Sequence, residues 1–116
     1  MNEAPDQGAE IHVCAVEETI EIIGGKWKCQ ILHTLQDGTK RFGDLRREIP
    51  DVTQRILTRK LRELEDHGVV HRKVYAEVPP RTEYSLTPLG QSLGPVLDAL
   101  ENWAIKSRLS ATKAQQ

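Results

Sequence analysis

The sequence predicts a mainly α domain with a small β component, an α+β fold in which helices dominate. Apolar side chains recur at helical spacing in five segments, whereas a period of two appears only on either side of Val78-Pro79-Pro80-Arg81. The 116 residues fit a single domain, and 38% hydrophobic with 28% charged residues is typical of a chain that folds. A two-domain enzyme is therefore not expected.

The two ends of the chain are polar and are expected to be flexible, over residues 1–10 and 110–116, with a folded domain over residues 11–109. The sequence contains no run of about 18 apolar residues, the length that a helix needs to span a bilayer. The first residues lack the basic start and apolar stretch of a signal peptide. These features predict a cytoplasmic protein with no membrane association.

The first two helices are expected on either side of a glycine pair. Gly24-Gly25 favours the end of the first, and the second covers residues 26–36 and ends before the turn pair Asp37-Gly38. In both helices apolar residues recur on one stripe. They are Val16, Ile20, Ile23, Trp27, Ile31, Leu32 and Leu35.

Two further helices follow with a tight turn between them. Pro50 stops a short helix over residues 41–49, and only Asp51 and Val52 separate it from a helix over residues 53–67, with Thr53 as N-cap. The apolar face of this fourth helix carries Ile56, Leu57, Leu61 and Leu64. Its opposite face carries Gln54, Arg55, Thr58, Arg59 and Arg62.

The period of two predicts a hairpin. Residues 70–75 and 82–86 alternate and are rich in β-branched and aromatic side chains, and the two prolines between them belong at a rigid tip because they cannot donate to a strand ladder. A long helix then begins at Pro88, capped by Thr87, and Gly94-Pro95 is expected to kink it. Its apolar stripe is Leu89, Leu93, Val96, Leu100 and Trp103.

This order of elements, with a basic second helix after a tight turn and a hairpin behind it, predicts a winged helix-turn-helix with a short β-hairpin wing. The charged residues are also distributed unevenly along the chain. Residues 1–25 hold six acidic residues and no Lys or Arg, whereas residues 40–81 hold eleven basic residues against seven acidic ones. One face is therefore expected to attract a polyanion. Because the predicted fold is a winged helix-turn-helix, we expect that polyanion to be double-stranded DNA.

Residue chemistry divides the predicted DNA contacts into three groups. The exposed start of the fourth helix can read base edges through Gln54, Arg55, Thr58 and Arg59. Contacts that position the protein on phosphates are expected from Lys40, Arg46, Lys60, Arg72 and Lys73, and Arg62 is a predicted DNA contact outside these groups. At the tip of the wing, Arg81 is suited to a minor groove.

Two other interpretations stay open. A charged helix face is often only solvated, since exposed Arg and Lys occur on every protein surface. The same fold could also serve as a protein-interaction module that binds an acidic partner without any DNA sequence preference. A stacking platform for single strands is not expected, because the few aromatic residues fall mostly on apolar faces.

The stretches "GGKWK", "RFGDLRREIP", "LTRKLRELEDHGVV" and "VYAEVPPRTEYSLTPLG" closely resemble the HxlR-type bacterial transcriptional regulators, relatives of the MarR group. The resemblance covers about Cys14 to Trp103. It implies a homodimer, with terminal dimerisation helices, that places two winged domains on a palindromic operator, and it favours a repressor. The residues expected at that interface are Val16, Ile20, Leu93, Val96, Leu97, Leu100 and Trp103.

Two cysteines are too few for a disulfide framework. Amides at a helix start favour the thiolate of Cys14, whereas Glu17 and Glu18 oppose it. In some members of the family that this chain resembles, the cysteine at the position of Cys14 senses oxidants or electrophiles. The resemblance therefore makes Cys14 a candidate sensor, and an oxidant or small molecule a candidate effector. Cys29 is expected to be a packing residue.

The histidines and carboxylates show no pattern of a metal site or an active site. Gly68 interrupts the pair His67 and His71, and neither a CxxC nor an HExxH spacing occurs. Phosphate-loop and nucleophile-elbow motifs are also missing from the sequence. We expect no metal, no cofactor and no enzymatic activity.

Overall fold

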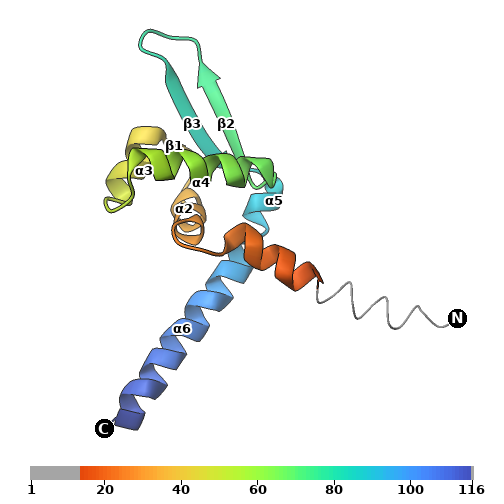
Figure 1. Cartoon of the computed structure of the whole chain (residues 1–116), viewed down its shortest axis with the longest axis vertical. Coiled ribbons are helices and arrows are strands. Elements are labelled where there is room, and N and C mark those ends of the chain that lie inside the picture. Colours follow the sequence, from red (N-terminus) through yellow and green to blue (C-terminus); the bar gives the residue numbers. More distant parts are fainter. Residues whose placement is uncertain (1–13, 116) are drawn as a thin grey trace, which may run out of the picture.

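The computed structural model describes the backbone of residues 14–115 and the side chains of residues 14–108. It contains a helix over residues 14–23, followed by α2 (Lys28–Leu35), β1 (Lys40–Arg41), α3 (Phe42–Glu48) and α4 (Gln54–Asp66). The strands β2 (Val70–Tyr75) and β3 (Arg81–Leu86) come next, and then the helices α5 (Pro88–Gln91) and α6 (Gly94–Gln115). Figure 1 shows the hairpin rising beside α4, with α6 running away on the other side.

The sheet contains a strand that the sequence did not predict. Its order is β1-β3-β2 with both pairings antiparallel, and Lys40 lies opposite Tyr84 while Val70 lies opposite Leu86. β1 spans two residues, too few to show an alternation of apolar and polar side chains. The predicted hairpin is confirmed, and β1 adds an anchor at the base of its second strand.

The core lies under α4. Leu57, Leu61 and Leu64 of this helix are fully buried and belong to one cluster with residues of α2, α3 and the sheet. The other members are Ile23, Ile31, Leu32, Leu35, Leu45, Ile49, Val52, Val69, Val70, Tyr84 and Leu97. Burying a leucine side chain stabilises a fold by about 1.5–3 kcal/mol, so this face fixes the rotation of α4.

The predicted C-terminal helix is divided in two. α5 ends at Gln91, and α6 begins at Gly94 after a turn at residues 92–93. Pro95 explains the break, because it has no N–H to donate to the Gln91 carbonyl and its ring would collide with that carbonyl in a continuous helix. α6 then continues to Gln115, so the segment expected as a tail from residue 110 is helical in the described backbone. Residues 1–10, expected to be flexible, lie outside the described residues.

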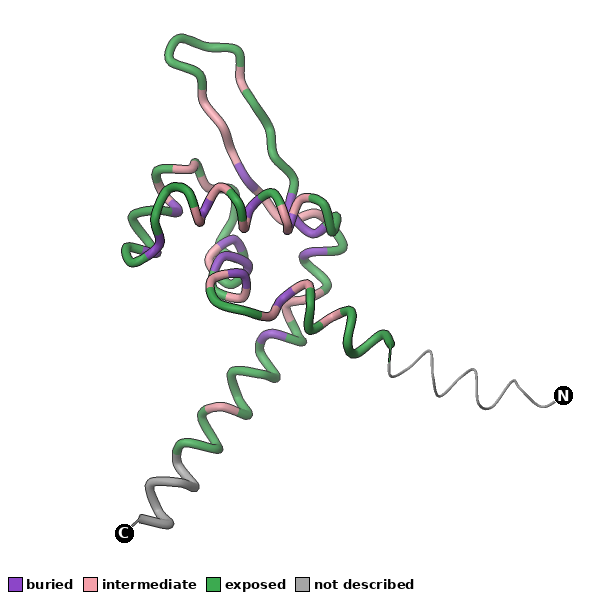
Figure 2. The backbone as a smooth tube through the Cα atoms, viewed as in Figure 1, coloured by how far each residue is buried: buried purple, intermediate pink, exposed green. Residues whose placement is uncertain are grey.

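The terminal helices project from the body of the domain. The Cα radius of gyration is 17.8 Å, whereas a compact domain of 100 residues has a value of about 13 Å. Figure 2 shows mostly exposed residues along the helix of residues 14–23 and along α6 after its first turns. Among the described residues, no helix is long and apolar enough to cross a membrane.

Gly90 provides a test of how α5 closes against the sheet. A Cβ atom at Gly90 would lie 2.1 Å from the Val69 carbonyl oxygen, which is backbone and cannot yield cheaply. We expect Gly90→Ala to lower the free energy of unfolding by about 1–3 kcal/mol through overpacking, measured by urea denaturation. The control is Gly43→Ala on α3, where the nearest atom lies 3.7 Å away. Equal stability of the two variants would contradict the close approach.

Candidate nucleic-acid interface

The start of α4 is held by its own cap and by the turn before it. Thr53 has extended backbone, and its hydroxyl oxygen accepts a hydrogen bond of 3.2 Å from the Ile56 amide, as predicted for an N-cap. Ile49 and Val52 in the turn are buried, which anchors the entry to the helix. One turn later the Thr58 hydroxyl donates to the Gln54 carbonyl at 2.8 Å. The first two turns of α4 are therefore ordered without using the side chains of Gln54, Arg55 and Arg59.

The outer face of α4 gathers the predicted base-reading residues on one shallow hollow. The hollow is lined by Gln54, Arg55, Thr58, Arg59 and Arg62. Within the described part of the chain, none of these three arginines forms an ion pair with a carboxylate. Three guanidinium groups that no carboxylate pairs with make a surface that attracts anions. We call these five residues the α4 face.

Several other predicted phosphate contacts are held by carboxylates. Lys40 Nζ lies 2.9 Å from Glu48, Lys60 Nζ lies 3.5 Å from Glu63, and Arg72 Nε lies 3.4 Å from Glu65. The hydrogen bond to the Glu48 carboxylate raises the pKa of Lys40. Such exposed pairs contribute about 0–1 kcal/mol each, so a phosphate could compete for these cations at low cost.

Arg46 and Lys73 differ from that group. Both are exposed, on α3 and β2 respectively, and within the described chain neither forms an ion pair. Lys73 Nζ lies 4.9 Å from the centre of the Tyr75 ring, an exposed cation–π contact that leaves the ammonium accessible.

A groove joins α4 to the wing. It is lined by Gln54, Thr58 and Arg62 from the helix and by Arg72, Thr82 and Tyr84 from the sheet, with Phe42, Leu61 and Glu65 at its floor and sides. The rings of Phe42 and Tyr84 lie 6.4 Å apart, and burial raises the pKa of Tyr84. The groove therefore brings Arg62 and Arg72 to one concave surface, although they are ten residues apart in the sequence.

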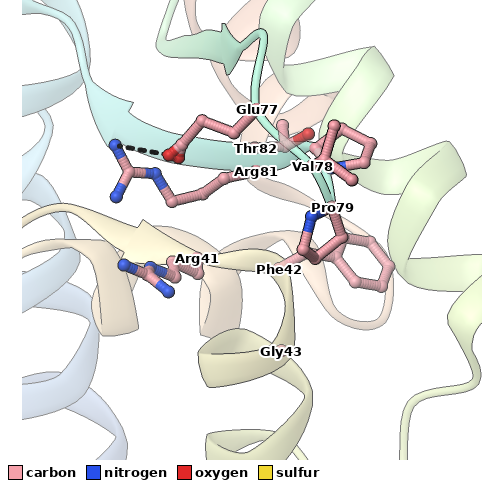
Figure 3. A pocket seen from close by; sticks show the side chains of 9 residues that line it. Arg41, Phe42, Gly43, Glu77, Val78, Pro79, Arg81 and Thr82 are labelled. Atoms are coloured by element: carbon pink, nitrogen blue, oxygen red, sulfur yellow. Dashed lines mark ion pairs between the residues drawn. The ribbon is translucent and has the colours of Figure 1, made fainter.

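The wing uses Arg81 internally. The guanidinium lies 3.8 Å from Glu77 and 3.7 Å from Glu83, and its carbon stacks 3.9 Å from the centre of the Tyr75 ring. The Tyr75 hydroxyl donates to Glu83 at 3.1 Å. Figure 3 shows Arg81 extended beside Glu77. A DNA contact by Arg81 therefore requires the side chain to exchange a carboxylate for a phosphate or a base.

The tip of the wing and Arg41 line the same hollow. Val78 is fully exposed at the tip, and Arg41, for which the sequence predicted no DNA contact, lines the hollow below it with Phe42 and Pro79 (Figure 3). Arg41 is exposed, and its backbone N–H donates to the Asp44 carboxylate at 3.1 Å. Only strand β1, which is too short to predict, places Arg41 beside the wing.

The predicted dimerisation residues fall into two groups. Val16 and Ile20 are 60% and 58% exposed, and on α6 Val96, Leu100 and Trp103 are 40%, 48% and 71% exposed. By contrast, Leu97 is buried in the core of its own chain and Leu93 packs against that core, because the start of α6 lies against the body. Leu97 therefore offers little surface to a second chain.

The two thiols are in different surroundings. Cys14 is exposed and lies with Glu17, Glu18 and Glu21 on a shallow hollow of the first helix. Cys29 is half-buried, and burial raises the pKa of its thiol, which agrees with the expected packing role. No group of three or more His, Cys, Asp or Glu side chains within the described chain could hold a metal ion.

Residues 22–111 match the family described as HxlR-like helix-turn-helix. An uncharacterized HTH-type transcriptional regulator of Methanothermobacter thermautotrophicus is 54% identical over 98 residues, 84% of this chain and 75% of that protein. The regulator YdeP of Bacillus subtilis, also uncharacterized, is 54% identical over 93 residues, which are 80% of this chain and 73% of its own.

Solved structures of transcriptional regulators are also similar to this chain. The redox regulator HypR in its reduced form superimposes with a TM-score of 0.80 at 46% identity, covering 85% of this chain and 98% of its own. The reduced form of the transcriptional regulator YodB from B. subtilis gives a TM-score of 0.70 at 36% identity, over 76% and 86% of the two chains. These similarities confirm the predicted winged helix-turn-helix fold and the predicted family resemblance.

Proposed function

Because the chain belongs to the HxlR-like helix-turn-helix family, we propose that it is a transcriptional regulator that binds double-stranded DNA sequence-specifically, as a homodimer on a palindromic operator. It acts in the cytoplasm as a repressor and has no enzymatic activity, in keeping with relatives whose names are those of regulators. Residues 11–109 form the unit that binds DNA and pairs with a second copy.

The α4 face carries this proposal. Five polar or basic residues line one hollow on the first turns of a helix whose opposite side is locked in the core, and its three arginines are free of acidic partners in the described chain. The first turns of such a helix reach base edges in the major groove. There Arg donates two bonds to guanine, Gln pairs with adenine, and Thr58 offers a methyl group or a hydroxyl. Gln54, Arg55, Thr58 and Arg59 are the proposed readers.

The remaining cations position the domain on the backbone. Arg46 and Lys73 meet phosphates directly, and Arg62 with Arg72 grips one across the groove between α4 and the wing. Lys40 and Lys60 exchange their carboxylate partners for phosphates when DNA arrives. Arg81 remains the proposed minor-groove contact of the wing, after releasing one of its two carboxylates.

The exposed apolar stripes support the homodimer. Val16 and Ile20 on the first helix and Val96, Leu100 and Trp103 on α6 leave more apolar surface in water than scattered single residues do. A second copy covers these stripes in a symmetric dimer. The two α4 helices then need to lie about 34 Å apart, or a multiple of that, to enter successive major grooves.

The experiment that tests this function is selection of duplexes from a randomised library by the purified protein, repeated at two salt concentrations. Enrichment of a palindrome, bound about 10³-fold or more above random duplex, supports the proposal. Salt-sensitive binding without an enriched sequence would contradict it. That outcome would favour the alternative, a protein-interaction module for an acidic partner.

Arg55 and Lys73 separate base reading from phosphate binding. We expect Arg55→Ala to weaken binding to the selected operator by about 1–3 kcal/mol while leaving affinity for random duplex nearly unchanged. Lys73→Ala should weaken both about equally and reduce the salt slope by about one. The measurement is fluorescence anisotropy on both duplexes over a salt series. An equal loss for Arg55→Ala on both duplexes would make Arg55 a phosphate contact.

Trp103 tests the proposed dimer. We expect Trp103→Glu to convert the dimer to monomer, because it places a charge where apolar stripes meet, and sedimentation velocity measures the change. Asn102→Glu is the matched control, since this exposed neighbour lies about 100° around α6 and adds the same charge. Dissociation of both variants, or of neither, would contradict the assigned stripe.

Cys14 is the proposed redox sensor, because its thiol is exposed near the start of a helix that belongs to the proposed dimer interface. Reduced and oxidized forms of HypR, and a diamide-treated form of YodB, are among the solved structures similar to this chain.

We expect diamide to release wild-type protein and Cys29→Ser from the selected operator and to leave Cys14→Ser bound. Cys29→Ser is the control because burial raises the pKa of that thiol. Operator affinity before and after diamide is the measurement. The same diamide response in Cys14→Ser as in the wild-type protein would exclude Cys14 as the trigger.

A further inference from the structure

Lys28 is a buried lysine, which is uncommon for a residue with a charged and strongly hydrated head. Only 8% of its surface is exposed. Its ammonium donates to the Glu21 carbonyl at 3.1 Å and lies 3.2 Å from Glu63 Oε1. The acceptors come from two separate elements, the last turn of the helix of residues 14–23 and the third turn of α4. A single side chain on α2 therefore joins the N-terminal helix to the proposed recognition helix.

The N-terminal helix has few other attachments to the body. Of its residues only Ile23 is fully part of the core, with Ile22 packed against it, whereas residues 14–18 are exposed. Figure 1 shows this helix leaving the body at one end. Its direction is therefore set near its C-terminus, where the Glu21 carbonyl meets Lys28.

The turn that follows is conformationally constrained. Gly25 has a φ of +79°, and Trp27 has a φ of +86°, which is a genuine outlier for a bulky residue. A non-glycine backbone held in this region is strained and persists only when its surroundings enforce it. The surroundings here are the packing of Trp27 against the core and the two contacts of Lys28, the next residue.

At the other end of the link, Glu63 lies in the last half of α4, where acidic residues gather, whereas the first half of the helix carries only basic charges. Burial opposes its charge, but the hydrogen bonds and positive charges of Lys28 and Lys60 outweigh burial and lower the pKa of Glu63. Glu63 therefore stays ionised and holds Lys28 from the third turn of α4.

We infer that Lys28 is a positioning residue that fixes the angle between the N-terminal helix and α4, and through the dimer interface sets the half-site spacing that the two α4 helices accept. This inference rests on the proposed function, because the N-terminal helix must contact the second copy. A purely stabilising residue would affect binding to every duplex alike, whereas a positioning residue changes the discrimination between spacings.

The variants are chosen to keep the fold. Lys28→Met preserves the aliphatic stem, and Glu63 is left with Lys60 and partial exposure to water, so no buried charge is stranded. Glu63→Met breaks the link from the other side but leaves the buried Lys28 ammonium with the Glu21 carbonyl alone, so its fold is checked by circular dichroism and thermal unfolding. The double variant, Lys28→Met with Glu63→Met, removes both charges of the pair and strands neither. Lys26→Met is the matched control, since this lysine lies in the same turn, is exposed, and contacts only the Trp27 ring within the described chain.

The test measures affinity for four duplexes derived from the selected operator: an isolated half-site, the full palindrome, a palindrome with one base pair added to the spacer, and one with a base pair removed from it. We expect the wild-type protein and Lys26→Met to prefer the native spacing. Lys28→Met should lose about fivefold or more of that preference while binding the half-site within about twofold of wild type. Glu63→Met and the double variant should show the same loss, because either change breaks one link.

Three results would count against the inference. If Lys28→Met and Glu63→Met both keep the wild-type spacing preference, Lys28 positions nothing. If the half-site and the palindrome lose affinity equally, Lys28 only shapes α4 within one chain. If the wild-type protein itself shows no preference for a palindrome over a half-site, the proposed function fails and the inference fails with it, a result that the wild-type measurement alone identifies.

Discussion

The burial of three leucines on one side of α4 is the constraint on which the rest of the structure depends. Leu57, Leu61 and Leu64 have almost no exposed surface, and truncating any one of them to alanine would cost about 2–5 kcal/mol. That cost fixes the rotation of the helix about its axis. The polar side of α4 is consequently turned outward as a unit, and the residues of the α4 face meet on one hollow without any interaction among their own side chains.

Within this frame, carboxylates decide which cations are available. Lys40, Lys60 and Arg72 each have one acidic partner, and Arg81 has two, whereas the arginines of the α4 face have none within the described chain. Surface pairs are weak, so these partners tune the cations and do not remove them. Among the proposed DNA contacts of the described chain, the cations that a polyanion meets without competition are therefore those of the α4 face, Arg46 and Lys73, whereas Arg72 and Arg81 of the sheet and wing must first be released from carboxylates.

Sequence reasoning predicted the helices, the hairpin and the α4 face because each depends on a local pattern of apolar spacing, turn residues or charge. It missed β1 and Arg41 because pairing with β3 is a contact between residues more than 40 positions apart. It assigned Arg81 to the wing tip without its partners, since nothing in the sequence brings Glu77, Glu83 and Tyr75 together. The sequence predicted that Gly94-Pro95 disturbs the last helix, but as a kink and not as a division into two helices. Leu97 lies at the same helical spacing as the exposed apolar stripe of α6, so the sequence places it with that stripe. Only its packing against the core of its own chain distinguishes it.

The projecting helices bear on how such a small domain could be controlled. A signal received at the N-terminal helix can change DNA binding only if that helix is mechanically connected to α4, and apolar packing through Ile22 and Ile23 alone would let it pivot, because such contacts have no fixed direction. A charged side chain that satisfies acceptors on both helices is directional and is costly to break when buried. Lys28 has this chemistry at a junction where both helices come within reach of its side chain. Trp27, whose φ of +86° is held by the packing around it, directly precedes Lys28, so the link begins from a constrained turn.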